Sequence, residues 1–236
     1  MASLAIQPEM NGARTAAPLA LYVHWPFCVS KCPYCDFNSH VRASVDHDEW
    51  RKALLADLAY EASLLPDHRL GSIFFGGGTP SLMEPVTVEA VIAAACDHWS
   101  LAEDLEITLE ANPNSAEAAR FADLARVGVN RISLGIQSFD DQALAFLGRA
   151  HSASEGLRAI DAAQSAVRRV SFDLIYALPD DTEARWSATL DRALGFQRPG
   201  LRRDGAGHDG LLLRHPGQRL EPAGAVGTGF EKNTVV

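Results

Sequence analysis

Five short apolar runs alternate in strict order with longer segments in which apolar residues recur every three to four positions. The runs lie at residues 19–24, 72–75, 105–109, 132–136 and 170–176. Such runs are typical of buried strands, and the three-to-four spacing is typical of helices with one buried face. Strands and helices that alternate in one order predict a parallel sheet with outer helices, which right-handed crossovers roll toward a barrel. We therefore predict an α/β fold, a partial TIM-like (β/α) barrel.

The expected helices have recognisable boundaries. Pro85 can open the second helix at its first turn, and Ser152 with Glu155 forms a capping box before a later one. One helix is expected after Asn114, continuing to Gly128. The last expected helix covers residues 182–194 and is apolar at Trp186, Leu190 and Leu194.

Three cysteines, Cys28, Cys32 and Cys35, stand in the loop directly after the first expected strand. Thiols three or four apart in a loop do not all point into one apolar layer, whereas they can converge on a metal centre. Thiolates are the usual ligands of iron–sulfur clusters, which normally take four, so three leave one iron open. A zinc site completed by His24 or His40 is an alternative. A disulfide with a third free thiol would need an oxidising compartment, which nothing in the sequence indicates.

Further unusual residues stand where later strands end. Three glycines at 76–78 follow the second strand, Glu110 follows the third, Gln137 follows the fourth, and Asp173 lies within the fifth. In a barrel of parallel strands, the chemistry gathers where strands end and the following loops begin. Each polar residue alone could instead cap a helix, pair with Arg131, or be a satisfied core group. Their common location favours a bound polar ligand.

Composition excludes some classes of partner. The formal net charge is −9, whereas binding to nucleic-acid phosphates depends on an excess of lysine and arginine. The apolar runs are far shorter than the roughly 20 residues of a transmembrane helix. Residues 1–18 lack the apolar stretch of a signal peptide, and we expect them to form a disordered leader. We expect a cytoplasmic protein that binds no nucleic acid and has no membrane span.

The spacing Cys-x3-Cys-x2-Cys, with Tyr34 before the last cysteine, resembles the radical S-adenosylmethionine (SAM) superfamily. The flanks YVHWPFC and CPYCDFNSH, with LEANP, GIQSF and FDLIYALP further on, resemble one branch of it. That branch holds the oxygen-independent coproporphyrinogen III oxidases and the HemW-type heme chaperones. The resemblance implies a [4Fe–4S] cluster held by Cys28, Cys32 and Cys35. Its fourth iron would chelate SAM and cleave it reductively to a 5′-deoxyadenosyl radical.

The resemblance also assigns a cofactor pocket. Tyr22 and Tyr34 would lie near the SAM bound to the cluster. The amino acid part of SAM would meet Gly77, Gly78 and Thr79, and the rest of the pocket would consist of Glu110, Gln137, Arg149 and Asp173. The Arg149 guanidinium could hold the SAM carboxylate with two hydrogen bonds. Its alternative is an exposed cation at a helix end. Cys96, on the buried face of the second helix, is interpreted as a core residue.

Residues 197–236 are rich in glycine and show no apolar periodicity that fits a strand or a helix. The family pattern would continue there with a sixth strand and a segment resembling His-Leu-Ser-x-Tyr, which this sequence lacks. We therefore divide the chain into a leader (1–18), a radical SAM partial barrel (19–196) and a disordered or aberrant tail (197–236). Our hypothesis is a family protein that is truncated or frame-shifted after about residue 196, with its C-terminal part lacking.

Three functions follow from the resemblance, and no catalytic side chain is assigned. The true oxidases continue as Cys-x2-Cys-x-Cys, and Phe37 occupies the last of these places here. This favours a HemW-like heme chaperone that passes heme to an acceptor protein. The alternatives are a coproporphyrinogen III oxidase that decarboxylates its porphyrinogen to protoporphyrinogen IX, and an inactive fragment of either. Implied partners are heme or a porphyrinogen, an electron donor such as flavodoxin, and a heme-acceptor protein.

Overall fold

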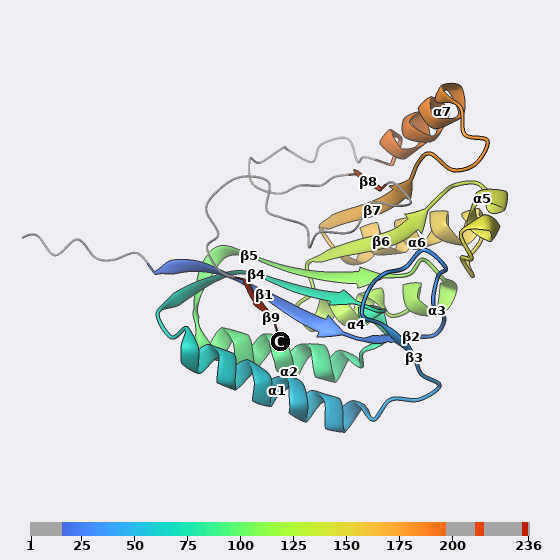
Figure 1. Cartoon of the computed structure of the whole chain (residues 1–236). Helices are drawn as coiled ribbons and strands as arrows, with labels where there is room; N and C mark the ends of the chain where they lie inside the picture. Colours follow the sequence, from blue (N-terminus) through green and yellow to red (C-terminus); the bar gives the residue numbers. More distant parts are fainter. Residues whose placement is uncertain (1–15, 197–210, 215–232, 236) are drawn as a thin grey trace, which may run out of the picture.

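The computed structural model describes residues 16–196 and the backbone of residues 211–214 and 233–235 (Figure 1). Within these residues one parallel sheet has the strand order β8-β7-β6-β5-β4-β1-β9. Its strands are β1 (Ala17–Trp25), β4 (His68–Gly77), β5 (Ser100–Ala111), β6 (Arg131–Gln137), β7 (Arg169–Ile175), β8 (Leu211–Arg214) and β9 (Asn233–Val235). A second small sheet pairs β2 (Phe27–Cys28) with β3 (His40–Val41). The predicted α/β fold is confirmed.

Helices follow the strands, and most of them lie along one face of the sheet (Figure 1). They are α1 (His47–Leu64), α2 (Pro85–His98), α3 (Ser115–Ala118), α4 (Phe121–Arg126), α5 (Asp141–Phe146), α6 (Ala153–Ala166) and α7 (Glu183–Leu194), with a 3₁₀ turn, η1 (Pro80–Leu82). Side-chain caps fix several helix starts, because they satisfy backbone N–H groups that a helix leaves unpaired. The predicted capping box of Ser152 and Glu155 is present at the start of α6.

The core lies between this helical layer and the outer face of the sheet. Along β1 the side chains of Leu19, Leu21 and Val23 are buried, while the residues between them are less buried. This alternation follows from the pleat of a strand, which sends successive side chains to opposite faces. The same outer face continues through the fully buried Ile73 of β4 and Leu134 of β6. Burial of these side chains holds the strand ends in fixed positions.

The inner face of β5, β6 and β7 is polar. We use "polar inner face" for six residues of three strands: Glu106, Thr108, Arg131, Ser133, Arg169 and Ser171. Glu106 pairs with the guanidinium of Arg131 at 3.0 Å and with that of Arg169 at 2.9 Å. Arg131 donates to the Ser171 hydroxyl at 3.0 Å, which donates to Ser133 at 3.3 Å. Barrels usually fill such positions with bulky apolar side chains, so this interior is built for polar contacts.

One helix expectation is corrected. The single helix expected after Asn114 is split into α3 and α4, because the chain turns at Arg120, whose guanidinium donates to the Met83 carbonyl at 2.7 Å. The helix expected over residues 182–194 is present as α7; its Trp186 packs against the core, whereas its Leu194 is 54% exposed. The reason is position: α7 lies beyond β7, away from the helices packed beneath the sheet (Figure 1).

The expectation of no regular element after residue 197 is corrected for two stretches. Leu211–Arg214 pairs with β7, and Asn233–Val235 pairs with β1. Both lie at edges of the sheet, where unpaired backbone groups accept any extended segment without a periodic apolar pattern. The remainder of this segment and most of the leader lie outside the described residues. Their expected disorder stays a prediction.

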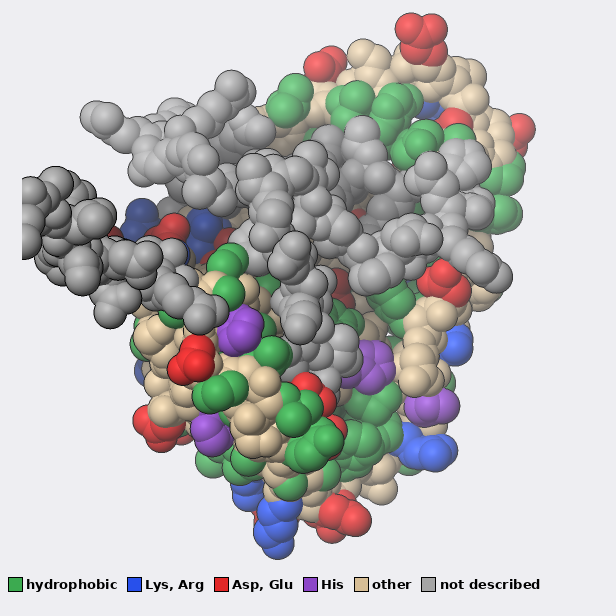
Figure 2. All heavy atoms as spheres, turned by 60° about the vertical axis from the view of Figure 1, so that its left-hand side comes forward, with side chains coloured by type: hydrophobic (Ala, Val, Ile, Leu, Met, Phe, Trp, Pro, Cys, Tyr) green, Lys and Arg blue, Asp and Glu red, His purple; other side chains and the backbone are tan. Residues whose placement is uncertain are grey.

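Surface charge is scattered on the face that Figure 2 shows. Blue basic and red acidic side chains are interspersed there among green apolar ones, and the described residues form no continuous basic stripe on it. Within the described part of the chain, no helix combines the length and the apolar character needed to cross a membrane.

Candidate functional site

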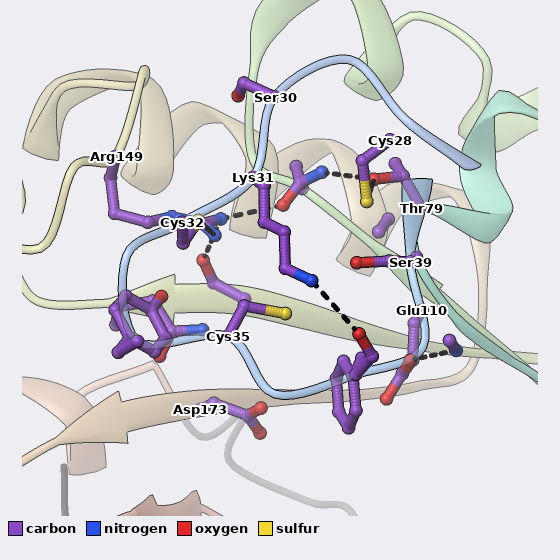
Figure 3. A pocket seen from close by; sticks show the side chains of 18 of the residues that line it. Cys28, Ser30, Lys31, Cys32, Cys35, Ser39, Thr79, Glu110, Arg149 and Asp173 are labelled. Atoms are coloured by element: carbon purple, nitrogen blue, oxygen red, sulfur yellow. Dashed lines mark hydrogen bonds between the residues drawn. The ribbon is translucent and has the colours of Figure 1, made fainter. Parts of the chain in front are cut away.

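One pocket lies where β4 to β7 end, and the loop after β2 covers it (Figure 3). Eleven of the twelve residues predicted for the site line this pocket: Cys28, Cys32, Cys35, Tyr34, Gly77, Gly78, Thr79, Glu110, Gln137, Arg149 and Asp173. The twelfth, Tyr22, is not a lining residue but packs against the strand that carries the glycines, since a Cβ on Gly76 would meet its ring at 2.8 Å. The structure therefore brings together residues that lie far apart in the sequence.

The cysteine loop is tied down at both ends. Backbone bonds join the His40 N–H to the Pro26 carbonyl at 2.6 Å and the Arg42 N–H to the Cys28 carbonyl at 3.3 Å. Inside the loop, the Cys35 N–H donates to the Cys32 carbonyl at 3.0 Å. Loops fixed in this way hold their side chains in a defined arrangement.

Two of the three sulfurs accept hydrogen bonds from the pocket wall. The Thr79 hydroxyl donates to Cys28 Sγ at 3.5 Å, and Arg149 Nη1 donates to Cys32 Sγ at 3.2 Å. Cys35 lines the same pocket. The part of the chain that the structure describes contains no three Cys, His, Asp or Glu side chains grouped closely enough for a single metal ion. The sulfurs instead surround one pocket.

The two histidines considered as zinc ligands have other surroundings. The ring of His24 contacts the Asn38 carbonyl through Nε2 at 3.0 Å, and its other side faces the glycine turn. His40 is exposed in the short strand β3. Neither is among the residues that line the pocket, and neither is Cys96, which is half-buried on α2 and packs against the core.

The glycine turn after β4 requires glycine for close packing. Gly77 has a φ of +113°, and a Cβ there would lie 2.6 Å from the ring of His24. A Cβ on Gly78 would lie 2.7 Å from the Phe27 carbonyl oxygen, because the backbone of the turn bonds directly to the segment before Cys28. The turn therefore has two roles: it supports the cysteine loop, and it presents bare backbone to the pocket.

Glu110 links the glycine turn to β5. Its carboxylate accepts a hydrogen bond from the Gly77 N–H at 3.2 Å. Burial, together with the negative charge of Glu110, raises the pKa of Tyr22 to about 12. The Tyr22 phenol therefore keeps its proton at neutral pH and is available as a hydrogen-bond donor beside the pocket.

Gln137 is a strained and buried residue at the end of β6. Its φ of +66° lies in the left-handed region, which costs a non-glycine residue on the order of 1 kcal/mol or more. Its Oε1 atom is buried and has no hydrogen-bond partner among the described residues. Such an atom needs an explanation, and a ligand or water donor is the usual one. Asp173 is also buried, and its carboxylate lies below the cysteine loop in Figure 3.

Arg149 lies in the pocket wall and is half-buried, so its alternative role as an exposed cation at a helix end is wrong. Its Nη2 atom donates to Asn112 Oδ1 at 2.7 Å and to the Gly135 carbonyl at 3.0 Å. Its Nε–H is buried and has no partner within the described ranges. Burial raises the pKa of Tyr34 to about 12, although the positive charge of Arg149 opposes this shift.

Sequence reasoning missed Asn112 and Glu117. Glu117 is 3% exposed and accepts hydrogen bonds from the Ser81 hydroxyl, from the Asn112 N–H at 2.8 Å and from the Asn114 amide at 2.6 Å. This carboxylate therefore joins η1 to the loop after β5. The signal available in the sequence was Asn112 itself, two residues after Glu110 in the same predicted strand-end loop.

His151 is a third residue that was missed, and it lies behind the pocket wall. It is buried, and its Nε2 lies 3.1 Å from the Ile136 carbonyl. Burial and the nearby Arg149 lower its pKa to about 4. The ring is therefore neutral at physiological pH, with its proton on Nε2, because a carbonyl oxygen can only accept.

Comparison with known proteins agrees with this geometry. Residues 22–193 match the family model of the radical SAM superfamily. The heme chaperone HemW of Escherichia coli K12 is 42% identical over 186 residues, which are 78% of this chain and 49% of that protein. Mouse mitochondrial radical S-adenosyl methionine domain-containing protein 1 is 44% identical over 193 residues, covering 81% of this chain and 43% of that protein.

Among solved structures, the coproporphyrinogen III oxidase HemN of Escherichia coli, described as a radical SAM enzyme, superposes with a TM-score of 0.68. It is 26% identical, and the match covers 78% of this chain and 43% of HemN. The chain thus spans about half the length of the relatives that it matches. With the cysteine loop, the glycine turn and the parallel sheet in the expected places, this chain belongs to the radical SAM superfamily, and within it the chain is similar to HemW and HemN.

Proposed function

We propose that Cys28, Cys32 and Cys35 hold a [4Fe–4S] cluster and that the pocket beneath them holds SAM. The observation that supports this most is the convergence of three cysteines and a glycine turn on one pocket. The three cysteines line this pocket from one loop, and thiolates are the usual ligands of iron–sulfur clusters. When bound, the cluster supplies the electron for the reductive cleavage of SAM.

The pocket also fits SAM by the chemistry of its walls. The bare backbone of Gly77 and Gly78 can approach the amino acid part of SAM where a Cβ would block it. The buried Nε–H of Arg149 can donate to the SAM carboxylate, and the buried Oε1 of Gln137 can accept from a hydroxyl or an amine. Two polar atoms without described partners would thereby be satisfied.

The remaining polar residues would orient the nucleoside part of the cofactor. Glu110 and Asp173 are acceptors when ionised, so they suit ribose hydroxyls or an ammonium group. Glu110 is positioned for this by its bond to the Gly77 N–H. Tyr22 and Tyr34 keep their protons at neutral pH and would act as donors beside the bound cofactor. The loop after β2 would cover the cluster and limit its contact with water.

For the function of the whole protein we propose a HemW-like heme chaperone that passes heme to an acceptor protein. Two observations favour it over the oxidase. Phe37 stands where the resemblance places an additional cysteine in true oxidases. The identity is 42% to a named heme chaperone but 26% to the coproporphyrinogen III oxidase. A reducing compartment such as the cytoplasm, with a flavodoxin-like electron donor, would suit an oxygen-sensitive cluster.

Anaerobic reconstitution with iron and sulfide tests the cofactor proposal. We expect about four irons and four sulfides per chain, with visible charge-transfer absorption. Cys28→Ala should lose this absorption, while the control Cys96→Ser should keep it. One zinc per chain without such absorption would contradict the assignment.

The same reconstituted sample separates the functions. Heme titration should show stoichiometric binding, followed by transfer to an apo-cytochrome, for a chaperone. Turnover of coproporphyrinogen III with SAM and a reductant, without heme binding, would support the oxidase instead. A sample that does neither would behave as the inactive fragment.

A further inference from the structure

The structure points to a role for Asn112 that nothing in the family assignment requires. Asn112 follows β5 and lies between the two groups that donate to cysteine sulfurs. Its Nδ2 donates to Thr79 Oγ1 at 3.2 Å, and its Oδ1 accepts from Arg149 Nη2 at 2.7 Å. Figure 3 draws both bonds. One side-chain amide thus contacts both donors, which come from segments 70 residues apart in the sequence.

The two bonds fix the direction in which each donor acts. Thr79 Oγ1 accepts from Asn112, so its single hydroxyl proton is left to point at Cys28 Sγ, 3.5 Å away. Arg149 Nη2 is held by Asn112 and by the Gly135 carbonyl, which leaves Nη1 directed at Cys32 Sγ, 3.2 Å away. Chains of hydrogen bonds of this kind polarise one another and strengthen each member.

Asn112 is itself held firmly. Its backbone N–H donates to the buried carboxylate of Glu117 at 2.8 Å. The same carboxylate also accepts from the Ser81 hydroxyl and from Asn114, so the position of Asn112 is set from two neighbouring loops. Thr79 is fixed as well, because its backbone N–H donates to the Phe27 carbonyl at 2.8 Å.

We propose that Asn112 is a positioning residue that sets the reduction potential of the cluster by aiming Thr79 and Arg149 at two of its three thiolates. Hydrogen bonds to the sulfurs and the net charge nearby are among the main determinants of such potentials. The reduced cluster carries one more negative charge, so donors to its sulfurs stabilise it more than the oxidised form. Loss of their alignment makes one-electron reduction by an external reductant less favourable. The inference rests on the proposed cluster.

The test is a redox titration with dithionite and mediators, in the absence of SAM, on the reconstituted full chain. We expect Asn112→Ala to reduce the equilibrium constant for one-electron reduction about tenfold, which is a negative shift of about 59 mV. The matched control is Asn130→Ala. Asn130 also uses both side-chain groups, accepting from the Ile107 N–H at 2.9 Å and donating to the Leu105 carbonyl at 2.8 Å, and it does not line the pocket.

The shifts in reduction potential among combined variants distinguish a positioning role of Asn112 from a merely structural one. If Asn112 acts through its two donors, Asn112→Ala should produce no further shift in a chain that already carries Thr79→Val and Arg149→Met. Thr79→Val alone is an independent test. It removes the hydroxyl that donates to Cys28 Sγ, so it should also lower the reduction potential. An unchanged potential in Asn112→Ala or in Thr79→Val, at iron content equal to the unmodified chain, overturns the proposal. An equal shift in Asn130→Ala overturns it too.

The iron content of the reconstituted chain distinguishes failure of the proposed function from failure of the inference about Asn112. An unmodified chain that takes up no cluster overturns the proposed function, and this inference with it. A chain that loads normally but shows no shift overturns the inference alone.

Discussion

In β5, β6 and β7 the two faces of the sheet are built from alternate residues of the same strands, yet their side chains differ in chemistry. On the outer face of β6, Ile132 and Leu134 are fully buried beneath helices. On the inner face of the same strand, Arg131 pairs with Glu106 of β5, and Ser133 bonds to Ser171 of β7. The outer face provides apolar burial, which is not directional. The inner face provides directional contacts. Toward the carboxyl ends of the strands its polar residues line the pocket, as Ser133 and Asp173 do.

The comparison teaches that fold and chemistry can change separately here. Substitutions on the outer face should change stability without changing the pocket's chemistry. Substitutions at the pocket end of the inner face should change cofactor binding with little effect on stability. Four predictions, in order of decreasing effect, test this separation.

The largest effect is expected at the cysteine loop. Cys35→Ala removes one of the three proposed ligands from a half-buried position. It should abolish cluster absorption after anaerobic reconstitution, because the two remaining thiolates cannot replace a ligand to the third iron. The urea midpoint of the metal-free chain should change little. Retention of full cluster absorption in Cys35→Ala would contradict the role of this cysteine as a ligand.

The next effect concerns the outer face. Leu134→Ala should lower the free energy of unfolding by about 2–5 kcal/mol, since it leaves a cavity where a fully buried side chain packed. Urea denaturation of the metal-free chain measures this change. The control is Leu101→Ala on β5, which is exposed and should stay within about 0.5 kcal/mol of the unmodified chain. Equal losses in both variants would contradict the assignment of the core.

The next prediction concerns the pH dependence of stability and His151, which is buried behind the pocket wall. The pKa of His151 is lowered to about 4 in the folded chain, against about 6.5 when unfolded. Between these values the unfolded chain binds more protons, so stability rises with pH across this window and is lost as pH falls from 6.5 toward 4. Urea midpoints measured from pH 7 to pH 4 should fall less steeply in His151→Gln. Parallel curves for the two chains would refute this contribution.

The smallest effect is expected in the polar inner face. Glu106→Gln leaves the two arginine side chains of Arg131 and Arg169 facing each other without a carboxylate between them. Because these side chains are part-exposed and screened by solvent, we expect a loss of about 1 kcal/mol, reduced by added salt. A second substitution, Arg169→Gln, should recover part of it. Urea denaturation at low and high salt measures both.

Much of the fold could be predicted because its signals are local. The five central strands were located from apolar runs of four to seven residues. The start of α6 was located from Ser152 and Glu155, which lie three positions apart and form the capping box. The pocket residues were predicted from their place at strand ends together with the family resemblance. The structure then brought eleven of the twelve to one pocket.

What escaped prediction depends on contacts between distant segments. The bond from Arg149 to Cys32 joins residues 117 positions apart, and the bond from Asn112 to Thr79 joins residues 33 apart. Neither distance leaves a periodic trace in the sequence. In the sequence, Glu106 is indistinguishable from an ordinary surface charge. In the structure it pairs with two arginines, which come from β6 and β7. Strands β8 and β9 use backbone pairing at the sheet edges, which side-chain patterns do not report.

The strand order has a consequence for how the chain is made. From β1 through β4, β5 and β6 to β7, each strand of the sheet pairs with the one that precedes it in this series. A chain leaving the ribosome from its N-terminus can therefore add one strand and one helix at a time to a growing edge, because each new strand pairs with the preceding strand of this sheet. The pairing of β9 with β1 places a later segment at the opposite edge of the sheet, so it can form only after β4 to β7 have been synthesised. Synthesis and assembly can thus proceed in the same direction.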